Sequence, residues 1–286
     1  MVQNGTVTSD RDEAKAKAKA KALTKAKGDL AKYSDTPQAV ARFVAQQLVM
    51  KPYVWSALSI HVHGERHLTD LSAPFIAISN HSSHVDTTVI YGALPRRLSR
   101  NLAAGAAADY FFKKKTSALG TRLFFNAYPV DRGGMKGHAG LSGRLLDDGV
   151  PLLIFPEGTR SRTGAMAKFK MGVSALSIQH DVPVLPIALV GAYAAMPYGQ
   201  KLPVPGRPTV HIVFGNPLRA HPGETVPRFN DRLYNRVLEL HDTTARAYGM
   251  PTQADFHRSV ALKAAARKAQ DVARRGRTAP DEDAQA

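Results

Sequence analysis

The chain has 286 residues, a formal net charge of +16 and no cysteine. The lack of cysteine excludes disulfides, thiolate metal ligands and a cysteine nucleophile, and with them an enzyme-bound acyl thioester. A hydrophobic content of 44% is enough for one main domain with a buried core. The positive charge favours anionic partners such as nucleic acid, anionic lipid headgroups or phosphorylated substrates, although it also fits a merely soluble surface.

The first 36 residues have the composition of a low-complexity cationic arm. Residues 14–21 alternate Ala and Lys, which in a helix of about 100° per residue places lysines on every side and leaves no apolar stripe. We predict a solvated, partly helical arm that either touches anionic lipid or only aids solubility. Because no run of about 18 apolar residues and no signal-peptide core occurs, we expect the protein to lie on a membrane if it meets one.

Residues 37–57 are predicted to form two short amphipathic helices separated at Pro52. The apolar positions of the first helix recur at helical spacing: Val40, Phe43, Val44 and Leu48. Arg42 and Gln46 lie on the opposite side of that helix. The second helix carries the only tryptophan, Trp55. Such a pair either contacts the membrane interface or packs on the catalytic domain, and the sequence leaves both interpretations open.

Residues 58–250 alternate short apolar strands with helical patterns. The predicted strands are 58–62, 74–79, 101–104, 127–130, 151–155, 184–190 and 209–214. The predicted helices are 84–94, 107–119, 136–146, 172–180 and 226–248. This alternation predicts an α/β domain with a mostly buried central sheet flanked by helices. Residues 251–286 are predicted to form a charged tail, helical or disordered.

The most informative segment is Asn80-His81-Ser82-Ser83-His84-Val85-Asp86, directly after the predicted strand 74–79. Of the eleven histidines, only His81 precedes an aspartate by five residues. An imidazole held at one nitrogen by a carboxylate can accept a hydroxyl proton at the other. Ligands of α/β sheets bind at the carboxyl ends of strands, where this segment lies. Taken alone, the pair also fits a helix-capping aspartate beside an incidental histidine.

Three further segments follow in order: Val130-Asp131-Arg132, Phe155-Pro156-Glu157-Gly158-Thr159-Arg160-Ser161, and residues 182–186. With these four segments the chain resembles the glycerolipid acyltransferases of the lysophosphatidic acid acyltransferase type, over about residues 60–214. The first and third segments are the specific ones. The resemblance implies transfer of a fatty acyl group from acyl-CoA or acyl-carrier protein to 1-acylglycerol 3-phosphate, giving phosphatidate, without a metal or other cofactor.

The resemblance also implies a role for individual residues. His81 is the general base and Asp86 orients it, as in a triad whose serine is replaced by the substrate alcohol. Arg132, at a strand end, contacts the acceptor's phosphate, since arginine binds phosphate oxygens bidentately. The glycerol phosphate is held by Glu157, Gly158, Thr159 and Arg160. Pro186 lies near the acyl donor.

Other functions fit parts of the sequence. A different lysophospholipid or a glycolipid acceptor needs the same hydroxyl chemistry. A serine esterase needs Gly-x-Ser-x-Gly, which does not occur. A basic lipid- or nucleic-acid-binding protein fits the charge, but no motif of specific nucleic-acid recognition is present. We expect an enzyme at the cytoplasmic face of a membrane rich in anionic lipids. The oligomeric state does not follow from the sequence.

Overall fold

The computed structural model describes residues 33, 36–107, 126–130, 140–200 and 202–276. Within this part of the chain, seven strands form one sheet in the order β1-β7-β6-β2-β5-β3-β4. The strands are β1 (Ser59–His63), β2 (Ile76–Ser79), β3 (Ala103–Ala107), β4 (Tyr128–Val130), β5 (Leu152–Ile154), β6 (Val184–Val190) and β7 (Thr209–Phe214). Each of them overlaps a strand predicted from its apolar run.

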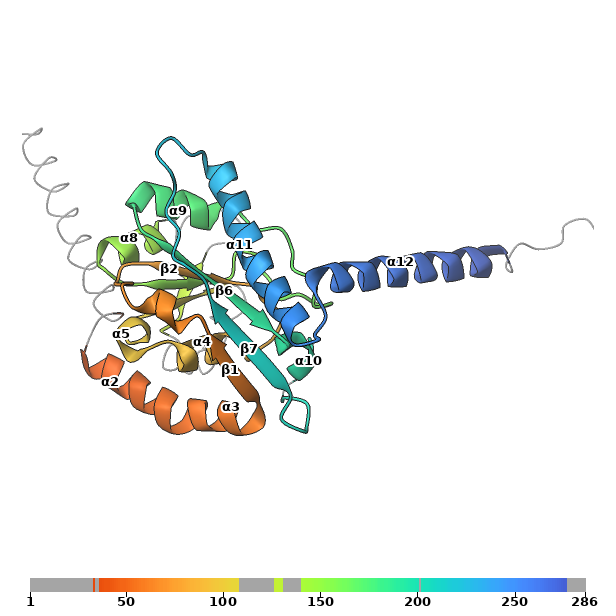
Figure 1. The fold of residues 1–286 in the computed structure, drawn as a ribbon, viewed down its shortest axis with the longest axis horizontal. Helices are drawn as coiled ribbons and strands as arrows, with labels where there is room; N and C mark the ends of the chain where they lie inside the picture. Colours follow the sequence, from red (N-terminus) through yellow and green to blue (C-terminus); the bar gives the residue numbers. More distant parts are fainter. Residues whose placement is uncertain (1–32, 34–35, 108–125, 131–139, 201, 277–286) are drawn as a thin grey trace, which may run out of the picture.

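Helices cover both faces of the sheet (Figure 1). On one face lie α8 (Leu141–Asp147), α9 (Gly172–His180) and α11 (Val226–Ala247). On the other lie α3 (Lys51–Ala57), α4 (Asp86–Ala93) and α5 (Arg96–Ser99). The short helices η2 (Glu65–Leu68) and α10 (Ala192–Ala195) lie in connections. The α/β class with a buried central sheet is confirmed.

The two faces of the sheet are packed by alternate residues of the same strand. Ile76 and Ile78 of β2 belong to the core beneath α9 and α11, whereas Ala77 packs with α4 on the other side. All four residues of β2 are buried. Alternate side chains of a strand point to opposite faces, so a strand covered on both sides is apolar throughout.

Strand direction determines where the loops meet. Every neighbouring pair in the run β6-β2-β5-β3-β4 is parallel. At the other end of the sheet, β7 pairs antiparallel with β6, and β1 pairs parallel with β7. Five strands therefore end at the same edge of the sheet. The described loops that follow β2, β5 and β6 converge there, at the usual ligand-binding edge of an α/β sheet.

The predicted N-terminal helical pair forms one continuous helical run (Figure 1). It consists of α2 (Thr36–Ala45), a π-helical turn η1 (Gln46–Met50) and α3. Pro52, the expected break, lies in the first turn of α3. Proline lacks an N–H and is tolerated in the first turn of an α-helix, and here a π turn precedes that first turn.

The polar side of this helical run is buried against the domain, whereas its apolar side is exposed. Arg42 and Gln46 are 4% and 7% exposed. The Arg42 guanidinium donates a hydrogen bond of 2.8 Å to the side-chain oxygen of Asn126. The exposed residues are instead apolar: Val40, Val44, Leu48, Val49 and Tyr53. A large apolar stripe therefore faces away from the domain.

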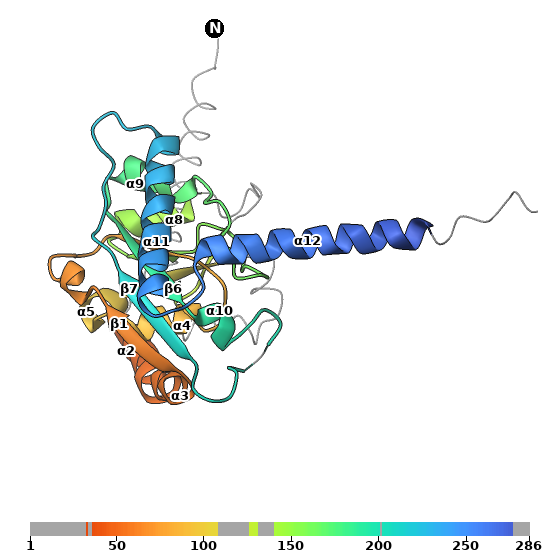
Figure 2. The same cartoon turned by 45° about the vertical axis from the view of Figure 1, so that its right-hand side comes forward.

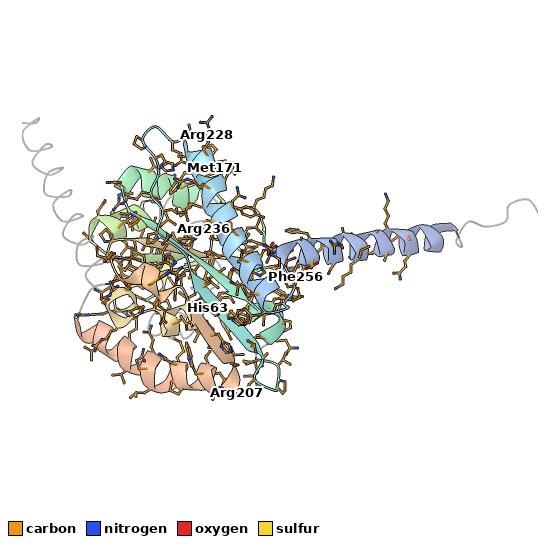
Figure 3. All side chains as sticks on the ribbon, viewed as in Figure 1. His63, Met171, Arg207, Arg228, Arg236 and Phe256 are labelled. Carbon is orange, nitrogen blue, oxygen red and sulfur yellow. The ribbon has the colours of Figure 1, made fainter. Side chains whose placement is uncertain are left out.

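The last helix, α12 (Gln253–Gly276), projects from the body beyond α11 (Figures 1 and 2). It lies within the predicted tail, and Thr252 and Asp255 cap its start reciprocally. The Asp255 carboxylate accepts from the Thr252 N–H at 3.0 Å, and the Thr252 hydroxyl accepts from the Asp255 N–H at 3.3 Å. Phe256, at the base of α12 (Figure 3), meets the ring of Tyr193 edge-on at 5.9 Å.

Some predictions fall on residues that the structure does not describe. They are the arm over residues 1–32, the helix over 108–119 and the first part of the helix over 136–146. The division of the chain at residues 36, 57 and 250 stays a prediction. In the described part of the chain, every helix is too short or too polar to cross a bilayer.

The contact between α3 and α4 depends on a glycine. A Cβ at Gly92 of α4 would lie 2.4 Å from two ring atoms of Trp55 on α3. We expect Gly92→Ala to lower the free energy of unfolding by about 1–3 kcal/mol, although alanine favours helices more than glycine does. Gly172→Ala, where a Cβ would meet no atom within 4 Å, is the control. Urea unfolding measures both, and a Gly92→Ala variant as stable as the wild type would contradict the packing described.

Candidate active site

The turn that carries His81 is fixed to the sheet by the residue before it. Asn80 follows the last residue of β2 and is 4% exposed. Its side-chain amide donates to the Leu189 carbonyl at 2.9 Å and accepts from the Leu189 N–H at 2.8 Å. The amide thus imitates a strand residue pairing with β6. His81 is therefore presented at a defined position on the carboxyl edge of the sheet.

His81 and Asp86 are in direct contact. The Nδ1 atom of His81 lies 2.8 Å from Oδ2 of Asp86. The same oxygen accepts from the backbone N–H groups of Ser82 and Ser83 at 2.7 and 2.8 Å. Asp86 is fully buried, and a carboxylate can only accept in these bonds. Nδ1 must therefore carry a proton, so that in the neutral imidazole Nε2 is the base.

The ring of His81 is also held from its face. It stacks on Phe155, which follows β5, with 3.9 Å between centroids and 17° between planes. Within the described part of the chain, Nε2 has no hydrogen-bond partner. The side chain is 19% exposed and lines a cavity. The geometry therefore leaves the basic nitrogen available to a ligand.

Glu157 connects the third sequence segment to His81. One carboxylate oxygen accepts from the His81 N–H at 2.7 Å, and the other accepts from the Ala167 N–H at 2.9 Å. The side chain is only 5% exposed. The resemblance implies that Glu157 holds the acceptor, but both of its oxygens bind backbone amides. In this structure Glu157 positions the backbone of His81.

The rest of this segment forms a tight loop beside His81. The Ser161 N–H donates to the His81 carbonyl at 2.7 Å. Gly158 has a φ of +75°, and a Cβ there would lie 2.9 Å from the end of the Lys170 side chain. Thr159 is exposed at the tip of the loop. Glycine thus permits both the turn and the passage of Lys170 across it.

Arg160 is half-buried on the same loop. Its Nη1 atom is buried without a hydrogen-bond partner in the described structure. Its guanidinium carbon lies 5.0 Å from the ring centre of Tyr198. Partial burial, followed by the positive charge of Arg160, lowers the pKa of the nearby His84 imidazole. Arg160 therefore supplies positive charge next to His84, three residues from the base, and one of its donors has no partner in the described structure.

A cavity of about 240 Å³ opens next to His81. Its lining is mostly small or apolar and comes from β3, β4, β5 and α9, including Gly105, Ala106, Val130, Ile154, Phe155, Val173 and Leu176. Lys170 is also part of the wall. Among the described residues, no three His, Asp or Glu side chains are grouped to bind a metal ion. The cavity suits an aliphatic chain whose reactive end reaches His81.

Two of the predicted site residues are not seen at this cavity. Arg132 lies outside the described residues, although β4 ends at Val130 on the same edge of the sheet. Pro186 lies in the fully buried strand β6, where its carbonyl accepts from the Gly215 N–H at 2.9 Å. The cavity beside His81 is lined by other residues. Pro186 therefore supports the sheet, and we do not assign it to the acyl donor.

Residues 192–198 belong to the site but were not identified from the sequence. The Ser83 hydroxyl donates to the Met196 carbonyl at 3.0 Å, and the Tyr193 hydroxyl donates to the Arg162 carbonyl at 3.1 Å. These bonds join the segment to both loops around His81. The parallel pairing of β6 with β2 predicts this position, because both strands end at the same edge.

The burial of Glu157 has a consequence for stability. Burial raises the pKa of its carboxyl group from 4.5 to about 7, against the opposing effect of the two N–H donors. Because this pKa is higher in the folded state than in the unfolded state, the protonated Glu157 contributes its full stabilisation below pH 4.5. This contribution to the free energy of unfolding is lost as the pH rises to 7.

Glu157→Gln removes this titration while keeping the size of the side chain. We expect the free energy of unfolding of the wild type, minus that of the variant, to fall by about 3 kcal/mol as the pH rises from 4.5 to 7. Urea unfolding of both proteins across this range measures the difference. A difference that is constant or rises with pH would contradict a raised pKa of the buried carboxyl.

Comparison with known proteins agrees with the geometry. A family model described as Acyltransferase matches residues 59–190. The 1-acyl-sn-glycerol-3-phosphate acyltransferase alpha of Bos taurus is 25% identical over 195 residues, which are 64% of this chain and 63% of the bovine protein. A 1-acyl-sn-glycerol-3-phosphate acyltransferase of Chlamydomonas reinhardtii is 29% identical over 163 residues, covering 54% of this chain and 45% of the algal protein.

A solved structure shares the fold. The 1-acyl-sn-glycerophosphate acyltransferase PlsC of Thermotoga maritima superposes with a TM-score of 0.54 at 22% identity, over 68% of this chain and 79% of that protein. The chain spans less than two thirds of the length of the curated relatives named above. The matched region contains His81, Asp86 and the loop of Glu157 to Arg160. Through this region, residues 59–190 are similar to the acyltransferase family.

Proposed function

We propose that the chain is an O-acyltransferase acting on a phosphorylated glycerolipid. It transfers a fatty acyl group from acyl-CoA or acyl-carrier protein to the free hydroxyl of 1-acylglycerol 3-phosphate, and the product is phosphatidate. The observation that carries this proposal is the contact between His81 and Asp86 at the mouth of an apolar cavity. The names of the relatives support the choice of acceptor.

The reaction follows from the protonation state of His81. Nε2 takes the proton of the acceptor hydroxyl while the oxygen attacks the thioester carbonyl. Asp86 stabilises the imidazolium that forms, as in a catalytic triad. The tetrahedral intermediate then collapses, an ester bond replaces the thioester bond, and the departing thiolate receives the proton from Nε2. The products are the acylated lipid and a free thiol, with His81 neutral again.

The surroundings of His81 fit both substrates. Arg160, with its unpartnered Nη1, and Lys170, at the cavity wall, are suited to the acceptor's phosphate. Arg132 remains the predicted third phosphate ligand. The apolar cavity suits the acyl chain of the donor. A glycolipid or a lysophospholipid with another headgroup would use the same base, but it would leave these cations without a matching charge.

We further propose that the protein is peripheral at the cytoplasmic face of a membrane, where α2 and α3 lie on anionic lipid. The support is the exposed apolar stripe of Val40, Val44, Leu48, Val49 and Tyr53, which are 45–72% exposed. Lys51 lies 5.2 Å from the ring centre of Trp55 on the same run. An exposed apolar helix face with aromatic and basic residues is typical of interfacial helices.

The role of His81 and Asp86 is tested by His81→Ala and Asp86→Asn. We expect each to reduce transfer at least about 100-fold, since the first removes the base and the second its orientation. The control is His257→Ala on the exposed side of α12. Mass spectrometry of the product from acyl-CoA and lysophosphatidic acid measures transfer, and circular dichroism checks folding. A folded variant of either residue with wild-type activity would remove the pair from catalysis.

The membrane contact is tested by Val44→Glu combined with Leu48→Glu. Two charges on the exposed stripe should weaken binding to phosphatidylglycerol vesicles by about tenfold or more. Leu262→Glu, at a residue that is 65% exposed on α12, is the control and should bind as the wild type does. Vesicle co-sedimentation measures binding. Equal binding by the double variant and the control would place the membrane contact elsewhere.

A further inference from the structure

Tyr198 contacts two cations of the site at once. The guanidinium carbons of Arg160 and Arg162 lie 5.0 and 5.1 Å from the centre of its ring. Both distances are within the range of a cation–π contact. Arg160 and Arg162 are two residues apart on one loop, so their charges repel each other. The electron-rich face of an aromatic ring is a neutral group that can hold both of them close together.

The two arginines have no acidic partner in the described part of the chain. Neither forms an ion pair there, although seven other arginine or histidine residues of the described chain pair with side-chain carboxylates. The Nη1 atom of Arg160 is in addition buried without a hydrogen-bond partner. Such a pair of cations, uncompensated inside the protein, is suited to an external dianion.

The segment that carries Tyr198 is attached to the rest of the site. Met196 accepts from the Ser83 hydroxyl, and Tyr193 donates to the Arg162 carbonyl. The Ser161 N–H, between the two arginines, donates to the His81 carbonyl at 2.7 Å. The ring, the arginines and the base therefore form one connected unit. We expect a substitution of Tyr198 to displace the two arginines more than it displaces His81.

We propose that Tyr198 is a positioning residue that holds Arg160 and Arg162 as a paired clamp for the phosphomonoester of the acceptor. This inference rests on the proposed transfer to a phosphorylated acceptor and adds the group that sets its selectivity. A phosphomonoester presents two negative charges and three free oxygens to two guanidiniums. A phosphodiester headgroup such as phosphocholine presents one negative charge and two free oxygens, so the clamp discriminates against it.

The contribution of the ring is separated from that of the hydroxyl by two substitutions. Tyr198→Phe keeps the aromatic face, and the Tyr198 hydroxyl has no hydrogen bond in the described structure, so this variant is the matched control. Tyr198→Leu keeps apolar bulk but removes the face. The ring is 43% exposed, so the substitution leaves no buried void.

The measurements are KM and kcat for lysophosphatidic acid and for lysophosphatidylcholine at fixed acyl-CoA. For Tyr198→Leu we expect KM for lysophosphatidic acid to rise about tenfold, with kcat and the KM for acyl-CoA within about twofold of the wild type. The preference for lysophosphatidic acid over lysophosphatidylcholine falls by the same factor. Tyr198→Phe keeps the wild-type values. In a background that carries both Arg160→Gln and Arg162→Gln, Tyr198→Leu adds little, because the ring acts through these two arginines.

Binding is measured separately by titrating sn-glycerol 3-phosphate into each protein in a calorimeter, which does not depend on turnover. Weaker binding by Tyr198→Leu and unchanged binding by Tyr198→Phe support the clamp. Equal binding and equal acceptor KM in the wild type and Tyr198→Leu overturn it, as does an equal loss in both variants. A wild type that binds the phosphate but transfers no acyl group counts against the proposed function and not against the clamp.

Discussion

One carboxylate oxygen organises the whole candidate site. Oδ2 of Asp86 accepts three hydrogen bonds, from Nδ1 of His81 and from the backbone N–H groups of Ser82 and Ser83. The two backbone bonds close the turn after β2 and fix the oxygen, and the third fixes the tautomer of the imidazole. A single buried atom thus determines both the fold of the loop and the chemistry of the base. Removing the carboxylate would disturb both.

The other parts of the site are attached to this turn. Glu157 binds the His81 N–H, Ser161 binds the His81 carbonyl, and Ser83 binds Met196. Loops that follow β2, β5 and β6 are therefore joined by hydrogen bonds at one edge of the sheet. Groups held by the interior of a protein lose little entropy when a substrate arrives, so a site of this kind is preorganised for positioning. Arg160 and Arg162 lie on the loop that Ser161 joins to the His81 carbonyl, and Lys170 lines the cavity beside His81.

Much of the fold can be predicted from the sequence because it depends on local patterns. The strands are short apolar runs between turn residues, and the predicted contact of His81 with Asp86 requires only a turn and the start of a helix. What the sequence does not show depends on distant partners. Arg42 is buried although the apolar spacing places it outside, because Asn126, 84 residues away, accepts its hydrogen bond. Glu157 likewise points inward because Ala167 and His81 offer it backbone amides.

The central claim is that His81 is neutral with its proton on Nδ1, so that Nε2 is the base. Nitrogen-15 NMR of histidine-labelled protein at neutral pH reports which ring nitrogen is protonated, and His81→Ala assigns the signal. The account predicts a protonated Nδ1, since Asp86 can only accept, and an unprotonated Nε2, since that nitrogen takes the proton of the alcohol. A signal from His81 with the proton on Nε2 would contradict the account, because that nitrogen could not then take a proton from an alcohol.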